Sequence, residues 1–244
     1  MKLSRLISSF VKNDKKLIKN EFEIITNNPQ SRPLNISFLG DSISTFKGWI
    51  PPNAKFWYSD AASKGTEVLN VNQTWWHLFL MQTGNKLMTN DSWSGSTICN
   101  KTGNGEDESY RSFINRFDKT MGKDNVLELK PDVIIVFGGT NDSSKNSPIG
   151  TVKYSDWTKS DLDTFGGAYS KLMSDLQYWN PSIRIINVQS SLLKRDYASI
   201  MEEVTSTLGI ENVLIPSYSG VGVHPDVQGM RTIANTLIKV IDKK

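Results

Sequence analysis

Runs of apolar residues bounded by glycine, proline or polar turn formers predict the strands of this chain. The clearest run, residues 133–137, shows no alternation of apolar and polar positions and is followed by two glycines. Such a run is typical of a strand buried on both faces of a parallel sheet. Four further strands are expected within residues 34–40, 85–90, 183–189 and 212–216.

Between these strands, apolar residues recur at the three- and four-residue spacing of amphipathic helices. Helices are predicted near residues 74–83, from Leu162 to the Asn-Pro pair at 180–181, over 197–208, and over the last apolar stripe, 230–241. Strands that alternate with helices indicate an α/β fold, a three-layer α/β/α sandwich around a parallel sheet. In such sheets ligands bind beyond the carboxyl ends of the strands, so the residues after each strand are the first candidates for function.

Two segments stand apart from this alternation. Residues 1–31 combine a short apolar stripe at helical spacing with turn formers, and we interpret them as an N-terminal helical appendage to one domain over residues 32–244. The connection from about residue 45 to residue 72 is too long for a simple link and is rich in aromatic residues. Long aromatic loops are commonly functional rather than disordered.

Composition and charge favour a globular protein without a nucleic-acid partner. Of the 244 residues, 38% are hydrophobic and 22% charged, and α/β chains of this length often form one domain. The formal net charge is only +3, too small a surplus to indicate nucleic acid as the main partner. Basic residues gather before residue 20; we interpret this run as a solvated helix face, with an anionic surface or partner as the alternative.

Cysteine count and hydropathy bear on the compartment. The single cysteine, Cys99, excludes a disulfide within the chain and a cysteine-rich metal site. The N-terminal apolar stretch is interrupted by Arg5, Ser8 and Ser9, so it does not form a convincing signal peptide. No segment approaches the ~18 apolar residues of a membrane span. These features predict a cytoplasmic protein without a membrane span, and they leave export by another route open.

Polar residues suited to acyl transfer follow three of the predicted strands. GDSIS follows the first and places Ser42 in a turn, where a base could activate its hydroxyl. NDSWSG follows the second and offers the backbone N–H of Gly95, and GGTND follows the third and offers the side-chain amide of Asn141. Two such donors aimed at one point make an oxyanion hole. His224, one of two histidines, follows the last strand and is the candidate base.

In this order, the motifs resemble those of the SGNH (GDSL-type) esterase family, from near Leu34 to the C-terminus, with residues 1–31 outside the match. The resemblance implies a flavodoxin-like fold with a mainly five-stranded parallel sheet, and a serine esterase that needs no metal or organic cofactor. It also implies that Ser42 is the nucleophile and that His224, in VHPD, is the general base. The oxyanion hole would consist of the Ser42 N–H, the Gly95 N–H and the Asn141 amide.

One position departs from the family's pattern. The family usually has aspartate three residues before the histidine, where this chain has Val221. An aspartate there would fix the imidazole tautomer and stabilise the imidazolium, and valine can do neither. Three alternatives follow: a Ser-His dyad oriented by a backbone carbonyl or a distant carboxylate, a substitute role for Asp226, or a protein that binds its ligand with impaired catalysis.

Aromatic residues around the expected site favour an ester of a carbohydrate, with an acetyl group above all, as the substrate. Aromatic faces suit the apolar faces of sugar rings. The alternatives are a lipid-type esterase, lysophospholipase or thioesterase, and a carbohydrate-binding protein on the same fold. The sequence leaves the oligomeric state open. The aromatic residues are Trp49, Phe56, Trp57, Tyr58, Trp75, Trp76 and Trp93, and at least one of Trp75 and Trp76 is expected in the core.

Other polar residues carry weaker signals. His77 lies among apolar helix residues and is expected to be packed rather than to bind a ligand. The charges of EDESYR, residues 106–111, are expected to be solvated rather than to bind a metal. No Gly-rich nucleotide-binding loop is present in the sequence.

Overall fold

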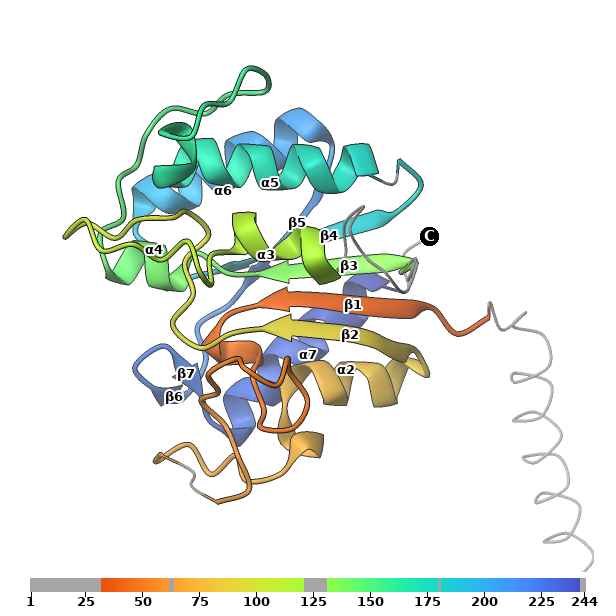
Figure 1. Ribbon diagram of the computed structural model, residues 1–244. Helices are drawn as coiled ribbons and strands as arrows, with labels where there is room; N and C mark the ends of the chain where they lie inside the picture. The colour runs from red at the N-terminus through yellow and green to blue at the C-terminus, as the bar shows by residue number, and fades with distance from the viewer. Residues whose placement is uncertain (1–31, 62–63, 121–130, 180, 242–244) are drawn as a thin grey trace, which may run out of the picture. The chain divides into compact units, whose positions relative to one another are not determined.

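The computed structural model describes residues 32–61, 64–120, 131–179 and 181–241. Five parallel strands form one sheet in the order β2-β1-β3-β4-β5 (Figure 1). The strands are β1 (Asn35–Gly40), β2 (Lys86–Ser92), β3 (Val133–Phe137), β4 (Arg184–Ser190) and β5 (Glu211–Ile215). The predicted parallel sheet is confirmed, and each predicted run coincides with one of its strands.

Helices cover both faces of this sheet. Alternate residues of β3 face opposite sides, as the two-residue period of a strand requires. Val133, Ile135 and Phe137 pack in a core with α2 and α7, whereas Ile134 and Val136 pack in a second core with α3, α5 and α6. Figure 1 shows α2 and α7 on one side of the sheet and α5 and α6 on the other, so the three-layer sandwich is confirmed. The helices are α2 (Trp75–Thr83), α3 (Phe113–Thr120), α4 (Thr140–Ser144), α5 (Phe165–Trp179), α6 (Arg195–Leu208) and α7 (Val227–Ile241).

The helix predictions are confirmed for α2, α5, α6 and α7, with one difference at the start of α5. Residues Asp161–Asp163 form a separate 3₁₀ turn, and Thr164 is extended, so α5 begins at Phe165 rather than at Leu162. The short helices α3 and α4 were not predicted. The five residues of α4 are polar and too few to show an apolar period.

Two irregular regions lie at the carboxyl end of the sheet. Between the 3₁₀ helices η1 (Ser42–Ser44) and η2 (Val71–Gln73), the described residues contain no strand and no α-helix, as expected for the long connection. Near the C-terminus, β6 (Gly220–Val221) and β7 (His224–Pro225) form a two-stranded antiparallel sheet.

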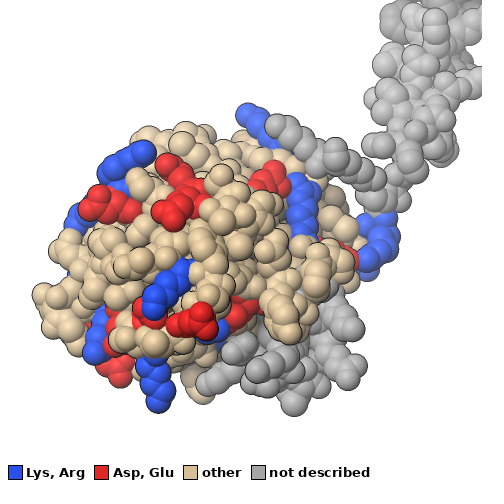
Figure 2. Space-filling view, turned by 90° about the horizontal axis from the view of Figure 1, so that it is seen from above, with Lys and Arg blue, Asp and Glu red and all other residues tan. Residues whose placement is uncertain are grey.

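The surface and the helices bear on the partners of the protein. On the face seen in Figure 2, acidic and basic side chains are interspersed rather than gathered by sign. Among the helices that the structure describes, none is both long and apolar enough to cross a membrane. The helix predicted within residues 1–31 lies outside the described residues.

Candidate active site

Ser42 lies just beyond the carboxyl end of β1, in the 3₁₀ helix η1. Gly40 ends the strand, and a Cβ there would lie only 2.6 Å from Ser44 Cβ, so glycine alone fits this turn. Asp41 caps η1 by accepting a hydrogen bond from the Ile43 N–H (2.9 Å). These contacts fix Ser42 at the edge of the sheet where ligands bind.

His224 reaches the Ser42 hydroxyl from the other end of the chain. Its Nε2 lies 2.8 Å from Ser42 Oγ, within the hydrogen-bond distance that a general base requires. The Tyr58 hydroxyl donates to the carbonyl of the next residue, Pro225 (3.0 Å), which anchors β7. The structure thus brings together the predicted nucleophile and the predicted base, which lie 182 positions apart.

The second ring nitrogen of His224 has a backbone partner. Val221 lies opposite His224 in the β6–β7 pair, and its backbone forms a hydrogen bond with the imidazole that raises the pKa of the ring. A backbone group that favours the protonated ring must be an acceptor, so this group is the Val221 carbonyl. Because Nε2 faces Ser42, the ring donates from Nδ1. This arrangement corresponds to the alternative in which a backbone carbonyl orients the base.

Asp226, the alternative partner of His224, is engaged elsewhere. Its carboxylate accepts hydrogen bonds from Ser219 Oγ (2.6 Å) and from the Gly229 N–H (2.8 Å). Burial opposes ionisation, but these bonds hold the pKa of Asp226 below its ordinary value. Asp226 immediately precedes α7, so its carboxylate caps that helix.

Burial sets the protonation state of His224. Desolvation, and next the positive charge of Lys64, lower the pKa of the imidazole from 6.5 to about 4, while the hydrogen bond to Val221 opposes the shift. The ring is therefore neutral at neutral pH, the state in which it can accept a proton.

An aromatic side chain covers one face of this imidazole. Trp57 stacks on His224 with ring centroids 3.5 Å apart and planes 1° from parallel. Tyr58 meets the same ring edge-on at 6.4 Å, and Lys64 Nζ lies 4.3 Å from the centroid of the Trp57 ring. All three residues belong to the long connection after η1, so this segment contributes directly to the surroundings of His224.

Hydrogen bonds link the groups predicted to form the oxyanion hole. Asn141 Nδ2 donates to the Ser96 carbonyl (2.9 Å) and lies 3.5 Å from the Asp41 carboxylate. Asn141 thereby bridges the residue before Ser42 and the residue after Gly95. Within the described chain, neither the Ser42 N–H nor the Gly95 N–H donates to a protein acceptor. Both N–H groups are thus open to a ligand oxygen, whereas the Asn141 amide has two protein acceptors, Ser96 and, at the longer distance, Asp41.

A buried ionic network holds the backbone at Gly95. Arg111 donates to the Ser94 carbonyl (3.2 Å), and Lys145 donates to the Gly95 carbonyl (3.1 Å). Glu108 accepts from both cations, from Lys145 at 2.6 Å and from Arg111 Nη2 at 2.8 Å. Burial opposes its ionisation, but these bonds hold the pKa of Glu108 below its ordinary value. The prediction that the charges of EDESYR are solvated is wrong for Glu108, which is 3% exposed.

Two further buried side chains, which the sequence did not single out, fix the ends of the strands. Arg116 Nη2 donates to the Gly40 carbonyl (2.5 Å) and to Ser96 Oγ (3.3 Å), and so ties the end of β1 to the loop after β2. Thr140 Oγ1 donates to Asp41 Oδ2 (2.5 Å). Burial raises the pKa of Asp41 to about 6, although the bond from Thr140 opposes this shift.

The predicted aromatic residues divide between the core and the surface. Tyr58, Trp75 and Trp76 are at most 1% exposed, so they form part of the core rather than a surface for a ligand. Trp49 and Phe56, in the long connection, are 44% and 39% exposed.

The remaining candidate residues serve packing. His77 contacts the rings of Trp49 and Trp76, and desolvation lowers the pKa of its imidazole, as expected for a packed side chain. Cys99 is buried, and its Sγ lies 3.3 Å from an Asp142 carboxylate oxygen. No cluster of three or more His, Cys, Asp or Glu that could hold a metal occurs among the described residues.

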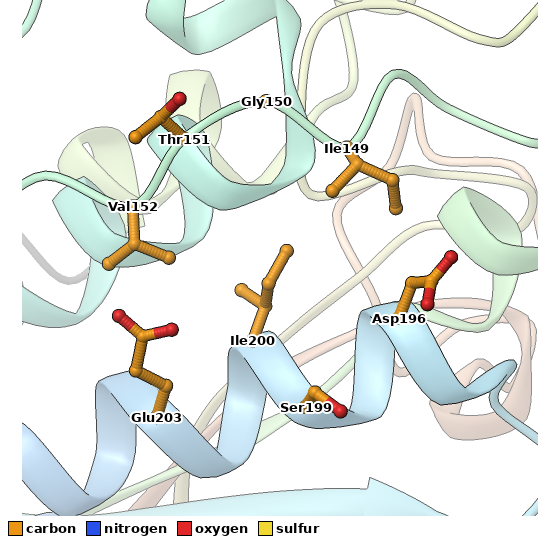
Figure 3. Close-up of a pocket in the computed structure, with 8 residues that line it drawn as sticks. All are labelled: Ile149, Gly150, Thr151, Val152, Asp196, Ser199, Ile200 and Glu203. Carbon is orange, nitrogen blue, oxygen red and sulfur yellow. The ribbon is translucent and has the colours of Figure 1, made fainter.

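A hollow of about 450 Å³ lies apart from these groups, between residues 149–152 and α6. Figure 3 shows Ile149, Val152 and Ile200 beside it, with the carboxylates of Asp196 and Glu203 along α6. None of the predicted site residues lines this hollow.

Comparisons with known proteins agree with the motifs. The family described as GDSL-like Lipase/Acylhydrolase matches residues 34–241. No curated protein matches the chain. A protein of known structure from Bacteroides ovatus ATCC 8483, named a GDSL-like lipase, is 35% identical, with a TM-score of 0.80 over 88% of this chain and 100% of its own.

Two further structures are similar. A protein from Bacteroides uniformis ATCC 8492 with the same name is 37% identical, with a TM-score of 0.79 over 87% of this chain and 97% of its own. A family two carbohydrate esterase from Clostridium thermocellum, solved with cellohexaose, shares the fold at 19% identity, with a TM-score of 0.59 over 86% of this chain and 65% of its own. The resemblance drawn from the motifs is thus confirmed, and the chain belongs to the GDSL-like lipase/acylhydrolase family of ester-bond hydrolases.

Proposed function

We propose that this protein is a serine esterase that removes acyl groups, acetyl groups above all, from carbohydrates. The observation that carries the proposal is the 2.8 Å contact between Ser42 Oγ and His224 Nε2. Ser42 attacks the ester carbonyl while His224 takes its proton, and His224 then returns the proton to the leaving alcohol. Water, activated by the same imidazole, releases the acyl group from Ser42 in the second half of the reaction.

The carbonyl of Val221 supports this chemistry in the absence of an aspartate. A hydrogen bond from Nδ1–H to that carbonyl fixes the tautomer in which the Nε2 lone pair faces Ser42. The carbonyl is neutral, so it stabilises the imidazolium less than an aspartate would. Turnover should therefore be slower than with an aspartate, but because the carbonyl still orients the ring, the loss of the aspartate alone does not favour binding without catalysis.

Two backbone donors are open to the oxyanion of the tetrahedral intermediate, the N–H groups of Ser42 and Gly95. The Asn141 amide donates to Ser96 and, at 3.5 Å, to Asp41, and it becomes the third donor when it turns from the Asp41 carboxylate toward the ligand. Donors of this kind contribute roughly 2.7–4 kcal/mol each to transition-state stabilisation. Arg111 and Lys145 hold the carbonyls of Ser94 and Gly95, which limits the rotation of the peptide that presents the Gly95 N–H.

Exposed aromatic side chains favour a carbohydrate as the carrier of the acyl group. Trp49 and Phe56 lie in the connection that also supplies Trp57, and Tyr110, 60% exposed, lies beside Arg111. Their rings offer flat apolar surfaces of the kind that sugar rings contact. The fold shared with carbohydrate esterases is consistent with this substrate class.

The test is hydrolysis by the wild type and by Ser42→Ala, with p-nitrophenyl acetate and glucose pentaacetate as probes. We expect the wild type to release acetate from both and Ser42→Ala to fall to the background rate. A p-nitrophenyl octanoate arm distinguishes the lipid-type alternative, for which the longer ester would be the better substrate. Equal rates for the wild type and Ser42→Ala would overturn the proposed esterase.

A further inference from the structure

The environment of His224 contains a layered stack. The imidazole and the Trp57 indole are parallel, with centroids 3.5 Å apart, and Lys64 Nζ lies 4.3 Å from the same indole. A parallel ring at 3.5 Å fills the face of the indole that it covers. The ammonium group therefore lies on the opposite face, and the order of the layers is Lys64, Trp57, His224.

Trp57 is itself fixed to the turn that carries the nucleophile. Its backbone N–H donates to Thr45 Oγ1 (2.8 Å), and Thr45 Oγ1 donates to the Ser42 carbonyl (2.9 Å). The next residue, Tyr58, accepts from the Lys47 N–H through its carbonyl (3.0 Å) and donates through its hydroxyl to the carbonyl of Pro225, which follows His224 in β7. The indole is thus held in a fixed relation to both Ser42 and His224.

The base needs a second constraint because the Val221 carbonyl supplies only one. A single hydrogen bond at Nδ1 fixes the tautomer but leaves the ring free to tilt about the line through the bond. In a triad, the charge of the aspartate also restrains the ring and keeps its second nitrogen directed at the serine hydroxyl. Here a flat indole in contact with the whole ring face prevents the tilt.

We propose that Trp57, backed by Lys64, is a positioning residue that takes the place of the missing aspartate in holding the plane of His224 toward Ser42. This role rests on the proposed function, since it assumes that His224 is the base. It also removes Trp57 from the set of residues that could stack on a sugar, because both faces of its ring are covered.

The charged groups around the imidazole agree with this arrangement. Lys64 is the charged side chain that shifts the pKa of His224. Of the nearby phenols, Tyr58 meets the imidazole ring edge-on, and Tyr218 donates to the carbonyl of Val223, the residue before His224 (3.0 Å). The carboxylates of Asp41 and Asp226 raise the pKa of Tyr58 but do not shift that of His224. Replacement of the indole by a smaller side chain would admit water and raise the pKa of His224 toward 6.5.

The experiment uses the full chain, in which the two histidines make NMR titration simple. His77→Gln assigns the signals of His224. In the wild type, we expect the ring protons of His224 to be shifted upfield by the Trp57 ring current. In Trp57→Leu, we expect that shift to be lost, the pKa of His224 to rise, and kcat for p-nitrophenyl acetate to fall roughly 10- to 100-fold with little change in KM. Trp57→Phe should restore part of kcat.

Two further variants separate positioning from other roles. Tyr178→Leu alters an aromatic side chain that is 88% exposed near the end of α5 and has no assigned part in catalysis or binding, so it should leave the signals of His224 and kcat unchanged. Lys64→Met, a surface change, should raise the pKa of His224 without loss of the ring-current shift. If Trp57→Leu does not fold, the His224 signals of the Lys64→Met variant still test the stack.

Particular outcomes would overturn the proposal. Unshifted ring protons of His224 in the wild type would show that the stack does not form. A Trp57→Leu variant with wild-type kcat, or with a raised KM alone, would show that Trp57 does not position the base. Failure of the proposed function is distinguishable, because it would appear as equal rates for the wild type and Ser42→Ala, while the NMR signals would still report the stack.

Discussion

Neutral groups orient the imidazole of His224: a backbone carbonyl at Nδ1 and an indole against the ring face. An aspartate would raise the pKa of the base, whereas burial and Lys64 lower it here to about 4. A base with a low pKa accepts a proton less readily, but it stays in its active, unprotonated form down to lower pH. The driving force for proton transfer to His224 is therefore smaller, but the ring stays unprotonated over a wider range of pH.

The pH dependence of the reaction follows from this pKa. Only the neutral ring can accept the Ser42 proton, so the rate falls as the pH falls through the pKa of His224. For the wild type and p-nitrophenyl acetate, we expect kcat/KM to rise with pH around a midpoint of about 4 and to stay level near pH 7. The measurement is kcat/KM from acid to neutral pH, with circular dichroism at each pH to verify folding.

A pair of variants at position 221 controls for this profile. Val221→Asp adds a negative charge beside the imidazole and should move the midpoint to higher pH, whereas Val221→Asn, without the charge, should move it less. A wild-type midpoint near the ordinary 6.5 would contradict the buried, cation-flanked environment of His224.

Sequence patterns could identify some residues of the site but not their surroundings. Ser42, Asn141 and His224 follow strands, and the carboxyl ends of parallel strands lie at one edge of a sheet, so their proximity was predictable. Trp57 and Lys64 lie in an irregular connection, where no periodicity relates a residue to its neighbours in space. Lys64 even has a left-handed backbone, with φ of 47°, which a lysine seldom adopts.

The same contrast holds for whole elements. The strands and the long helices were predictable because the sheet imposes unbroken apolar runs on β3 and a one-sided stripe on α7. The β6–β7 pair, with two residues in each strand, is too short to show any pattern, although it places His224. The loop that presents Gly95 is likewise held by long-range hydrogen bonds from Arg111 and Lys145 rather than by local preference.

That loop yields a prediction at the scale of an element. Glu108→Gln retains the shape of the side chain but leaves Arg111 and Lys145 without their shared negative charge. Loss of one partner from a buried ion pair costs about 3–5 kcal/mol. Because the Lys145 side chain is 29% exposed, we expect the free energy of unfolding to fall by about 3 kcal/mol or less. We also expect kcat to fall roughly tenfold or more, because the Gly95 N–H loses its fixed direction.

Urea unfolding and steady-state kinetics measure the two effects of Glu108→Gln. Glu203→Gln, which changes an exposed carboxylate on α6, is the matched control and should alter neither quantity. A loss of stability with an unchanged kcat would show that the network supports the fold but not the oxyanion hole.

At the scale of the molecule, one sheet separates two apolar cores, and the reactive groups gather at the edge where its strands end. Each core draws one set of alternate residues from β3 and covers it with its own helices. Because helices cover both faces of the sheet, irregular connections form the surface at the carboxyl ends of its strands. These connections can vary without loss of either core, and this is why the proposed function assigns substrate choice to the segment that carries Trp49 and Phe56.

The predicted boundary between residues 31 and 32 gives the last prediction. Both described cores consist of residues from Leu34 to Ile241, and the family match covers residues 34–241. A chain that begins at residue 32 should therefore keep its kcat/KM and change its Tm by less than about 2 °C, the effect of roughly 0.5–1 kcal/mol in a chain of this size. Thermal unfolding by circular dichroism, with p-nitrophenyl acetate hydrolysis, measures both. A markedly lower Tm would show that residues 1–31 stabilise the domain, and a raised KM with an unchanged Tm would show instead that they help to bind the substrate.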